Sequence, residues 1–348
     1  MEEKNGTVCV TGGTGYVASW LIMRLLQRGY TVRATVRSNP ENKRDLSYIT
    51  NLPGAAERLK IYNAELNKPE SFKEAIEGCV GVFHVAHPMK TEGKEAEELA
   101  TKTAVEGLLG ILNASLNSKS VKKVVYTSTL ATIMYNDKGL SVTDESTWSD
   151  IDICRRNTQS SSISSSYLVS KTVTEKTALD FATKNELDLV TVVLPLVVGP
   201  FICPYIPSSI SFTLAIVFGK QEMYKNVNNF YMVHIDDAVD AHIFLFENPN
   251  AKGRYICSSI QMTTYATVQF LSAKYHEYQA STISSDDFKE TEDCMISKLS
   301  SMKLLDLGFK YRFGMEEMFD GAIQCCKDRG FLRHINHVSN NTKEDNIV

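Results

Sequence analysis

The sequence predicts an α/β fold built on a doubly wound parallel sheet, followed by a smaller carboxyl-terminal substrate lobe. Two observations indicate the parallel sheet: short apolar runs alternate with helical patterns, and a glycine-rich turn directly follows the first run. A third observation indicates the second lobe. From Pro200 onward prolines and aromatic residues become frequent, and short strand and helix patterns are mixed.

Each element follows from its local pattern. Strands are predicted at residues 7–10, 31–37, 59–64, 80–86, 123–128 and 189–198. These runs are nearly all apolar, which is typical of strands buried on both faces. After the first strand Val17, Leu21 and Leu25 share one helical stripe, and Gly29 ends that helix. Longer helices are predicted at about 94–117 and 167–184.

The two lobes are predicted to share the middle of the chain. Residues 232–247, "MVHIDDAVDAHIFLFE", have the pattern of a strand and a helix that return to the first lobe. The predicted division is a first lobe of residues 1–199 and 232–254, a second lobe of residues 200–231 and 255–332, and a disordered tail, 333–348.

Composition excludes several classes of function. The chain has 348 residues, of which 43% are hydrophobic and 22% charged, as is usual for a globular protein. A net charge of −4 argues against binding of nucleic acid, which requires a positively charged surface. No signal peptide or membrane span is predicted, and eight scattered cysteines without metal-ligand spacing favour a reducing cytoplasm and no metal site.

A phosphate-binding loop is predicted from "TGGTGYVASW" after the first strand. Gly12, Gly15 and Ala18 form G-x-x-G-x-x-A, in which glycines permit a tight turn and close approach of a pyrophosphate to a helix N-terminus. The alternative is a plain turn, but the strand–loop–helix context favours a Rossmann-type dinucleotide site. Thr14 and Tyr16 complete the loop residues that we expect to contact the cofactor.

The second predicted strand indicates which dinucleotide is bound. It ends in Arg37, with Lys43 and Arg44 shortly after, and no Asp or Glu occurs between residues 31 and 40. A carboxylate there would hold an unphosphorylated ribose, whereas arginine can clamp a 2′-phosphate. We therefore expect NADP(H), the alternative being that these cations are solvated surface charges. Glu65 and Leu66 follow the third strand, near the expected adenine.

A catalytic group is predicted where "TQSSSISSSYLVSKT", residues 158–172, leads into a helix. Tyr167 and Lys171 are four residues apart and so share a helical face, where an ammonium and an oxidised nicotinamide can stabilise a phenolate. A chance surface pair is the alternative. Ser128 and Thr129 end the fifth strand, and one hydroxyl there can bind a substrate carbonyl or merely satisfy the backbone.

The sequence resembles the extended short-chain dehydrogenases/reductases of the plant dihydroflavonol reductase group. The segments that carry this resemblance span nearly the whole chain: "VCVTGGTGYVASWLIMRLLQRGYTVRATVR", "GCVGVFHVAHPM", "DESTWSD", "YLVSKT", "LPLVVGPFI", "VHIDDAVDAHIFLFENPNAKGRYICSS" and "LLDLGFKY". The resemblance implies an NADPH-dependent carbonyl reductase of plant specialised metabolism, acting on a flavonoid, isoflavonoid or alkaloid carbonyl. Thr129 takes the position of the family's catalytic serine and Ser128 a supporting one, with Tyr167 and Lys171 as its tyrosine and lysine.

The resemblance also implies further contacts. It adds Val85, Ala86, Pro195 and Val198 to the cofactor-binding residues, with Lys171 holding the nicotinamide ribose. The substrate residues implied are His87, Met89, Met134 and Tyr205.

Two departures from the family's pattern concern the substrate. Apolar Met134 replaces the asparagine that binds flavonoid hydroxyls, which predicts a substrate other than a dihydroflavonol. His87 and Lys90 stand in "HVAHPMK", where the group carries threonine and aspartate. His87 can be a second acid–base, a polar substrate contact or a packing histidine.

Three functions are compatible with these residues. The first is an oxidoreductase that interconverts a small-molecule carbonyl and alcohol, as a monomer or weak homodimer. The second is a catalytically silent NADP-binding scaffold or sensor, and the only observation that favours it is the threonine at position 129 in place of the family's serine. The third is an epimerase or dehydratase of the same fold. Retention of Tyr167 and Lys171 favours the first, because a silent binder needs no tuned phenol.

Overall fold

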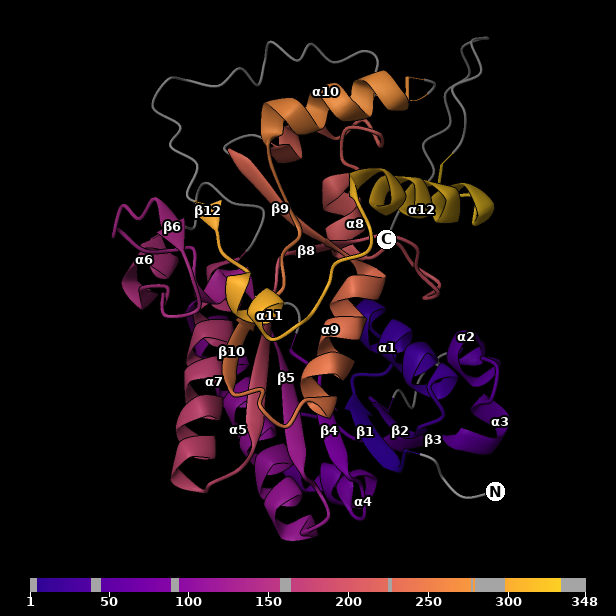
Figure 1. Cartoon of the computed structure of the whole chain (residues 1–348), viewed down its shortest axis with the longest axis vertical. Helices are drawn as coiled ribbons and strands as arrows, with labels where there is room; N and C mark the ends of the chain where they lie inside the picture. The colour runs from indigo at the N-terminus through magenta and orange to yellow at the C-terminus, as the bar shows by residue number, and fades with distance from the viewer. Residues whose placement is uncertain are drawn as a thin grey trace.

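A seven-stranded parallel sheet forms the centre of the first lobe in the computed structural model (Figure 1). The structure describes residues 5–38, 45–88, 94–156, 164–224, 227–276, 278 and 298–332. The strand order is β10-β7-β5-β4-β1-β2-β3. Its strands are β1 (Thr7–Thr11), β2 (Thr31–Val36), β3 (Leu59–Asn63), β4 (Gly81–His84), β5 (Lys123–Thr129), β7 (Leu189–Leu194) and β10 (Gly253–Ile256). The predicted doubly wound parallel sheet is confirmed.

Helices cover both faces of this sheet. One face carries α1 (Tyr16–Gln27) and α9 (Ile235–Glu247), and the other carries α5 (Lys94–Ser118) and α7 (Ser165–Lys184). Successive strand residues enter different cores: Val125 packs with the α1–α9 side, whereas Val124 and Tyr126 pack with α5 and α7. This double burial explains why the strands read as continuous apolar runs. Short helical turns complete the first lobe: α2 (Ser47–Thr50), α3 (Ala55–Arg58), η1 (Pro69–Phe72), α4 (Lys73–Ile76), η2 (Leu130–Thr132) and α6 (Ile151–Arg156).

The predicted strand at 189–198 is two strands. β7 ends at Leu194, and β8 (Leu196–Val198) pairs with β9 (Asn229–His234) in a separate three-stranded sheet whose other edge is β11 (Ile260–Thr263). Pro195 lies at the break. Proline has no N–H to donate to a strand ladder, so the chain leaves the large sheet there. The strand β9 therefore belongs to the small sheet, and only its helix α9 packs against the large one.

Among the remaining elements, three helices pack against the small sheet and one packs against β10 at the edge of the large sheet. The remaining elements are α8 (Ser208–Thr213), η4 (Gln221–Tyr224), α10 (Thr264–Lys274), α11 (Met302–Asp306), α12 (Met315–Asp328) and the short pair β6 (Val142–Thr143) and β12 (Lys298–Leu299). The predicted tail, 333–348, lies outside the described residues. In the described part of the chain, no helix combines the length and the apolar character needed to cross a membrane. Within those same residues no group of acidic, histidine and cysteine side chains could hold a metal ion.

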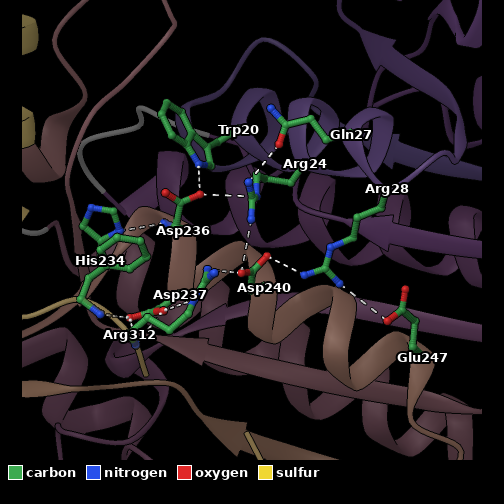
Figure 2. Close-up of polar contacts among 11 residues, drawn as sticks. Trp20, Arg24, Gln27, Arg28, His234, Asp236, Asp237, Asp240, Glu247 and Arg312 are labelled. Atoms are coloured by element: carbon green, nitrogen blue, oxygen red, sulfur yellow. Dashed lines mark hydrogen bonds and ion pairs between the residues drawn. The ribbon is translucent and has the colours of Figure 1, made fainter. Parts of the chain in front are cut away.

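A network of charged side chains joins α1 to α9 (Figure 2). Asp240 accepts from Arg28 at 2.9 Å, lies 3.6 Å from Arg24 and also pairs with Arg312, which precedes α12. Trp20 Nε1 donates to Asp236 Oδ1 at 2.9 Å. The helix that begins at the glycine loop is thus fastened to α9 and, through Arg312, to the carboxyl-terminal segment.

Candidate active site

The glycine loop lies at the carboxyl ends of β1, β2 and β4. Gly12 has φ +71°, and a Cβ there would stand 3.0 Å from Ala86 Cα. Gly13 donates its N–H to Thr35 O at 2.8 Å, and a Cβ on it would meet Ala34 Cβ at 3.1 Å. Position 12 favours glycine through both its positive φ and this close approach, and position 13 through the close approach alone. Gly15 is the N-cap of α1 and, having no side chain, leaves the first-turn N–H groups open to an anion.

Thr11 fixes the loop after β4 against the glycine loop. Its hydroxyl oxygen accepts from the N–H groups of Val85 and Ala86, each at 3.1 Å. A hydroxyl has one proton to give, so Thr11 donates it to Nδ1 of His84 at 2.9 Å. Burial, with a smaller contribution from Lys171, lowers the pKa of His84 to about 3, which keeps the ring neutral. Two of the expected cofactor-binding residues, Val85 and Ala86, therefore line the same edge as the glycine loop.

Other expected cofactor-binding residues gather around this loop. The carbonyl oxygen of Thr14 accepts hydrogen bonds from the hydroxyl groups of Tyr48 at 3.1 Å and Tyr205 at 2.9 Å. Tyr16 donates to Gly199 O at 3.2 Å, which ties the start of α1 to the segment after β8. Tyr205, expected to contact substrate, thus lies with its hydroxyl on the phosphate loop.

Pro195 and Val198 lie at the crossing from β7 into β8, where Val198 is fully buried. Val198 belongs to the hydrophobic core. Pro195 lies in the connection between the two sheets, and Val198 ends β8, where it pairs with His234 of β9.

The residues expected to choose the dinucleotide are only partly described. Arg37 directly follows β2 and is exposed, two residues beyond the Thr35 carbonyl that binds the glycine loop. Glu65 follows β3, its carboxylate lies 3.7 Å from Lys68 Nζ, and its backbone N–H donates to Ser71 Oγ at 3.0 Å. Leu66 is partly buried against the core beneath α5. Lys43 and Arg44 lie outside the described residues.

The predicted catalytic residues come from β5 and α7. Tyr167 occupies the first turn of α7, whose N-cap Ser164 accepts the Tyr167 N–H at 3.4 Å. Burial raises the pKa of Tyr167, and a hydrogen bond with the Thr129 side chain acts in the opposite direction. The two hydroxyl groups are therefore neighbours. Desolvation of the ring outweighs this hydrogen bond, so the protein atoms by themselves raise the phenol pKa. The lowering expected from Lys171 together with an oxidised nicotinamide stays a prediction.

Lys171 lies one turn further along α7 and is 4% exposed. Its ammonium donates to Thr127 O at 2.9 Å and stands 5.0 Å from the centre of the Tyr126 ring. Burial lowers the pKa of Lys171 to about 8, and the carboxylate of Glu175 opposes this change. At neutral pH the ammonium is thus still the main form.

His87 joins this group from the loop after β4. Its ring meets the Tyr167 ring edge to face, with centres 5.5 Å apart, and its Nε2 lies 3.4 Å from Ser170 Oγ. Burial, followed by the positive charge of Lys171, holds the pKa of His87 well below its usual value. The imidazole is therefore neutral, and it can offer a hydrogen bond beside Tyr167 without adding charge.

The other expected substrate residues are spread more widely. Met134 lies just beyond η2, with 43% of its surface exposed. Tyr205 is 46% exposed, in addition to its contact with Thr14. Met89 lies outside the described residues, as do Lys90 and the serine-rich residues before position 164.

Sequence reasoning missed two residues beneath the site, Glu175 and Arg254. Glu175 is fully buried and accepts a hydrogen bond from Ser128 Oγ at 2.6 Å, so Ser128 is turned toward α7. Arg254, on β10, donates to Glu175 at 3.1 Å. One signal was available: Tyr167, Lys171 and Glu175 recur every four residues on one helical face. No local pattern pointed to Arg254, which is distant in sequence.

Comparison with known proteins assigns the chain to a family. Residues 8–257 match the model of the NAD dependent epimerase/dehydratase family. The chain is similar to vestitone reductase of Medicago sativa, 48% identical over 332 residues that cover 95% of this chain and 100% of the relative. It is also 53% identical over 334 residues to Protein BRI1-5 ENHANCED 1 of Arabidopsis thaliana, covering 95% of this chain and 91% of that protein.

Two further likenesses agree with these. Dihydroflavonol 4-reductase of Callistephus chinensis is 43% identical over 348 residues, which cover 99% of this chain and 93% of the relative. The crystal structure of alfalfa vestitone reductase superposes with a TM-score of 0.83 at 46% identity, covering 94% of this chain and 100% of that one. The chain therefore belongs to the NAD dependent epimerase/dehydratase family, as an oxidoreductase akin to the plant dihydroflavonol and vestitone reductases.

Proposed function

We propose that this protein is an NADPH-dependent reductase, or the reverse alcohol dehydrogenase, acting on a carbonyl or alcohol of a plant specialised metabolite. The observation that carries the proposal is the contact of the Tyr167 and Thr129 hydroxyls, one helical turn from the buried ammonium of Lys171. The glycine loop and the residues that follow β4 lie at the same edge of the sheet. A hydroxyl pair beside a dinucleotide site suits proton transfer coupled to hydride transfer.

Each proposed catalytic residue has one task. The Thr129 hydroxyl holds the substrate oxygen, Tyr167 gives that oxygen its proton during reduction, and Lys171 keeps a positive charge beside the site. Burial raises the pKa of Tyr167, so the phenol stays protonated until the strongly basic oxygen that develops on the substrate takes its proton. When bound, the nicotinamide ring supplies the hydride. In the reverse direction its positive charge favours the phenolate.

The glycine loop suits the pyrophosphate of this cofactor. Gly12 and Gly13 allow the loop to pack closely on its neighbours, and the open N-terminus of α1 offers N–H groups and a positive dipole end. Exposed Arg37, next to the strand end that binds the loop, is the proposed partner of a 2′-phosphate. We therefore expect a preference for NADPH over NADH that Arg37→Gln reduces.

The proposed substrate class is a flavonoid, isoflavonoid or alkaloid carbonyl. Two relatives bear names that state such chemistry, vestitone reductase and dihydroflavonol 4-reductase. Neutral His87, in ring contact with Tyr167, offers one hydrogen bond to a polar group of the substrate. Met134 offers only apolar contact where dihydroflavonol reductases bind hydroxyls, which favours substrates other than dihydroflavonols.

The test is Tyr167→Phe, assayed with a panel of aromatic ketones, hemiacetals and flavonoid or alkaloid carbonyls. We expect kcat to fall about 10²–10⁴-fold, because general acid catalysis is lost, while NADPH binding measured by fluorescence stays unchanged. Tyr30→Phe is the matched control: it removes a hydroxyl that donates to Glu247 at 2.9 Å, outside the site, and should retain full turnover. Wild-type turnover by Tyr167→Phe would overturn the mechanism, and NADPH binding without turnover by the wild-type protein on every substrate would favour a silent binder.

A further inference from the structure

A buried ion pair lies beneath the proposed catalytic residues. The Glu175 side chain is 0% exposed and that of Arg254 is 6% exposed, and Arg254 Nε lies 3.1 Å from Glu175 Oε1. Glu175 also accepts hydrogen bonds from the hydroxyl groups of Ser128 and Thr191, each at 2.6 Å. Its carboxylate is thus held by β5, β7 and β10 together. A charge pair at this depth needs such a complete set of partners, because desolvation is otherwise too costly.

The other N–H groups of Arg254 donate hydrogen bonds to the segment that follows β5. Nη1 donates to the carbonyl oxygens of Glu145 at 2.9 Å and Thr147 at 2.7 Å, and Nη2 donates to Thr132 Oγ1 at 2.9 Å. The guanidinium also stacks on Trp148, 3.6 Å from the ring centre. A rigid planar fork with every arm engaged fixes this segment in one arrangement.

These contacts converge on Thr129 from two sides. Thr132, held by Arg254, donates its own hydroxyl to Thr129 O at 3.0 Å. Ser128, the preceding residue, is held by Glu175. The backbone on either side of the proposed catalytic hydroxyl is therefore attached to one ion pair.

The same carboxylate also acts on Lys171, one turn away on α7. The titratable groups that face Lys171 are His84 and His87 from β4 and its loop, Tyr126 from β5, and Tyr167 and Glu175 from α7. Both histidines are neutral, because burial lowers the pKa of each. The negative charge of Glu175 raises the pKa of Lys171, against the larger effect of burial.

We propose that the Glu175–Arg254 ion pair is a positioning unit, which fixes Thr129 through Ser128 and Thr132 and places a negative charge next to Lys171. This inference rests on the proposed function, since it assigns the pair a role only if these residues carry the reaction. Neither residue of the pair need touch the substrate. Its two tasks, geometry and charge, are separable by mutation.

Geometry is tested with Thr132→Val, which keeps the shape and the ion pair but removes the hydroxyl that binds Thr129 O. We expect kcat to fall about 10-fold or more without a change in the pH profile, since small misplacement of a catalytic group is costly. Thr132→Ser restores the hydroxyl and should restore kcat. Wild-type kcat in Thr132→Val would overturn the geometric role.

Charge is tested with Glu175→Gln, measured as kcat against pH. Loss of the carboxylate lowers the pKa of Lys171 further, so the alkaline decline of activity should move about one pH unit toward acid. Asp237→Asn is the matched control, because it removes another fully buried carboxylate that faces an arginine, Arg312. Its alkaline limb should stay in place, whatever stability it loses. An unmoved limb in Glu175→Gln would overturn the electrostatic role.

Folding and NADPH binding are checked in every variant by thermal unfolding and fluorescence. If Glu175→Gln does not fold, the Thr132→Val and Thr132→Ser pair decides the proposal by itself. The outcome is also separable from that of the proposed function. Full turnover in Tyr167→Phe removes the mechanism, whereas an inactive Tyr167→Phe with wild-type behaviour in both Thr132→Val and Glu175→Gln removes only the positioning role.

Discussion

Asp240 is the residue through which α1, α9 and the carboxyl-terminal segment are joined, and Asp240→Asn tests this. Its side chain is 9% exposed and faces Arg28 at 2.9 Å, Arg24 at 3.6 Å, and Arg312 (Figure 2). Removing the charge leaves three guanidinium groups facing one another. Breaking a fully buried pair costs about 3–5 kcal/mol and a surface pair about 0–1 kcal/mol.

The arginines decide where between these limits the effect falls. Their side chains are 27%, 35% and 49% exposed for Arg24, Arg28 and Arg312, so water screens part of the lost attraction. We expect Asp240→Asn to lower the free energy of unfolding by about 2–3 kcal/mol and Tm by roughly 3 °C. Urea denaturation and thermal unfolding at low salt measure both.

The control for Asp240→Asn is Glu247→Gln. Glu247 lies 3.6 Å from Arg28, and its side chain is 44% exposed, so its loss should change the free energy of unfolding by less than about 0.5 kcal/mol. If Asp240→Asn loses no more stability than Glu247→Gln, the network does not fasten α1 to α9 as described.

Two further predictions concern the site. Buried Lys171 loses its proton at a pKa of about 8, whereas in the unfolded chain the same group keeps its proton up to about 10.5. Between these two pH values the wild-type protein should therefore gain about 3 kcal/mol of unfolding free energy relative to Lys171→Met. Urea titrations in which the difference between the two proteins stays constant would contradict this. Gly12→Ala should weaken NADPH binding in a fluorescence titration, because its Cβ would meet Ala86 Cα at 3.0 Å. Gly139→Ala shares the positive φ with nothing within 4 Å and should bind normally; equal affinities of the two variants would refute the close-packing argument.

Much of the first lobe could be predicted from sequence because its determinants are local. Six apolar runs and the helices between them were found from periodicity, and α5 and α7 begin and end within two residues of the prediction. The division at Pro195 was missed, since an unbroken apolar run does not show where a chain changes sheets. That change depends on which neighbouring strand is available for pairing, and β9 is distant in sequence.

The site residues likewise fall into those that the sequence predicts and those that only the structure shows. Tyr167 and Lys171 could be paired from the sequence because a helix brings together residues four apart, and Ser128 and Thr129 because they end a strand. Residue types alone left the two hydroxyls open, and only the family resemblance gave the catalytic position to Thr129; in the structure Ser128 donates to Glu175 and Thr129 bonds Tyr167. The sequence also could not show that Tyr205 donates to the phosphate loop.

What the sequence determined by itself is the class of sheet, the glycine loop and the helical pair of a phenol and an ammonium, since each is set by residues adjacent on one element. What only the tertiary structure decided is the environment of that pair. Burial raises the pKa of Tyr167 and lowers that of Lys171, and these shifts come from atoms that several distant strands and helices bring around the two groups. The ion pair of Glu175 with Arg254, 79 residues later, belongs to the same category: desolvation and long-range pairing exist only once the chain has folded.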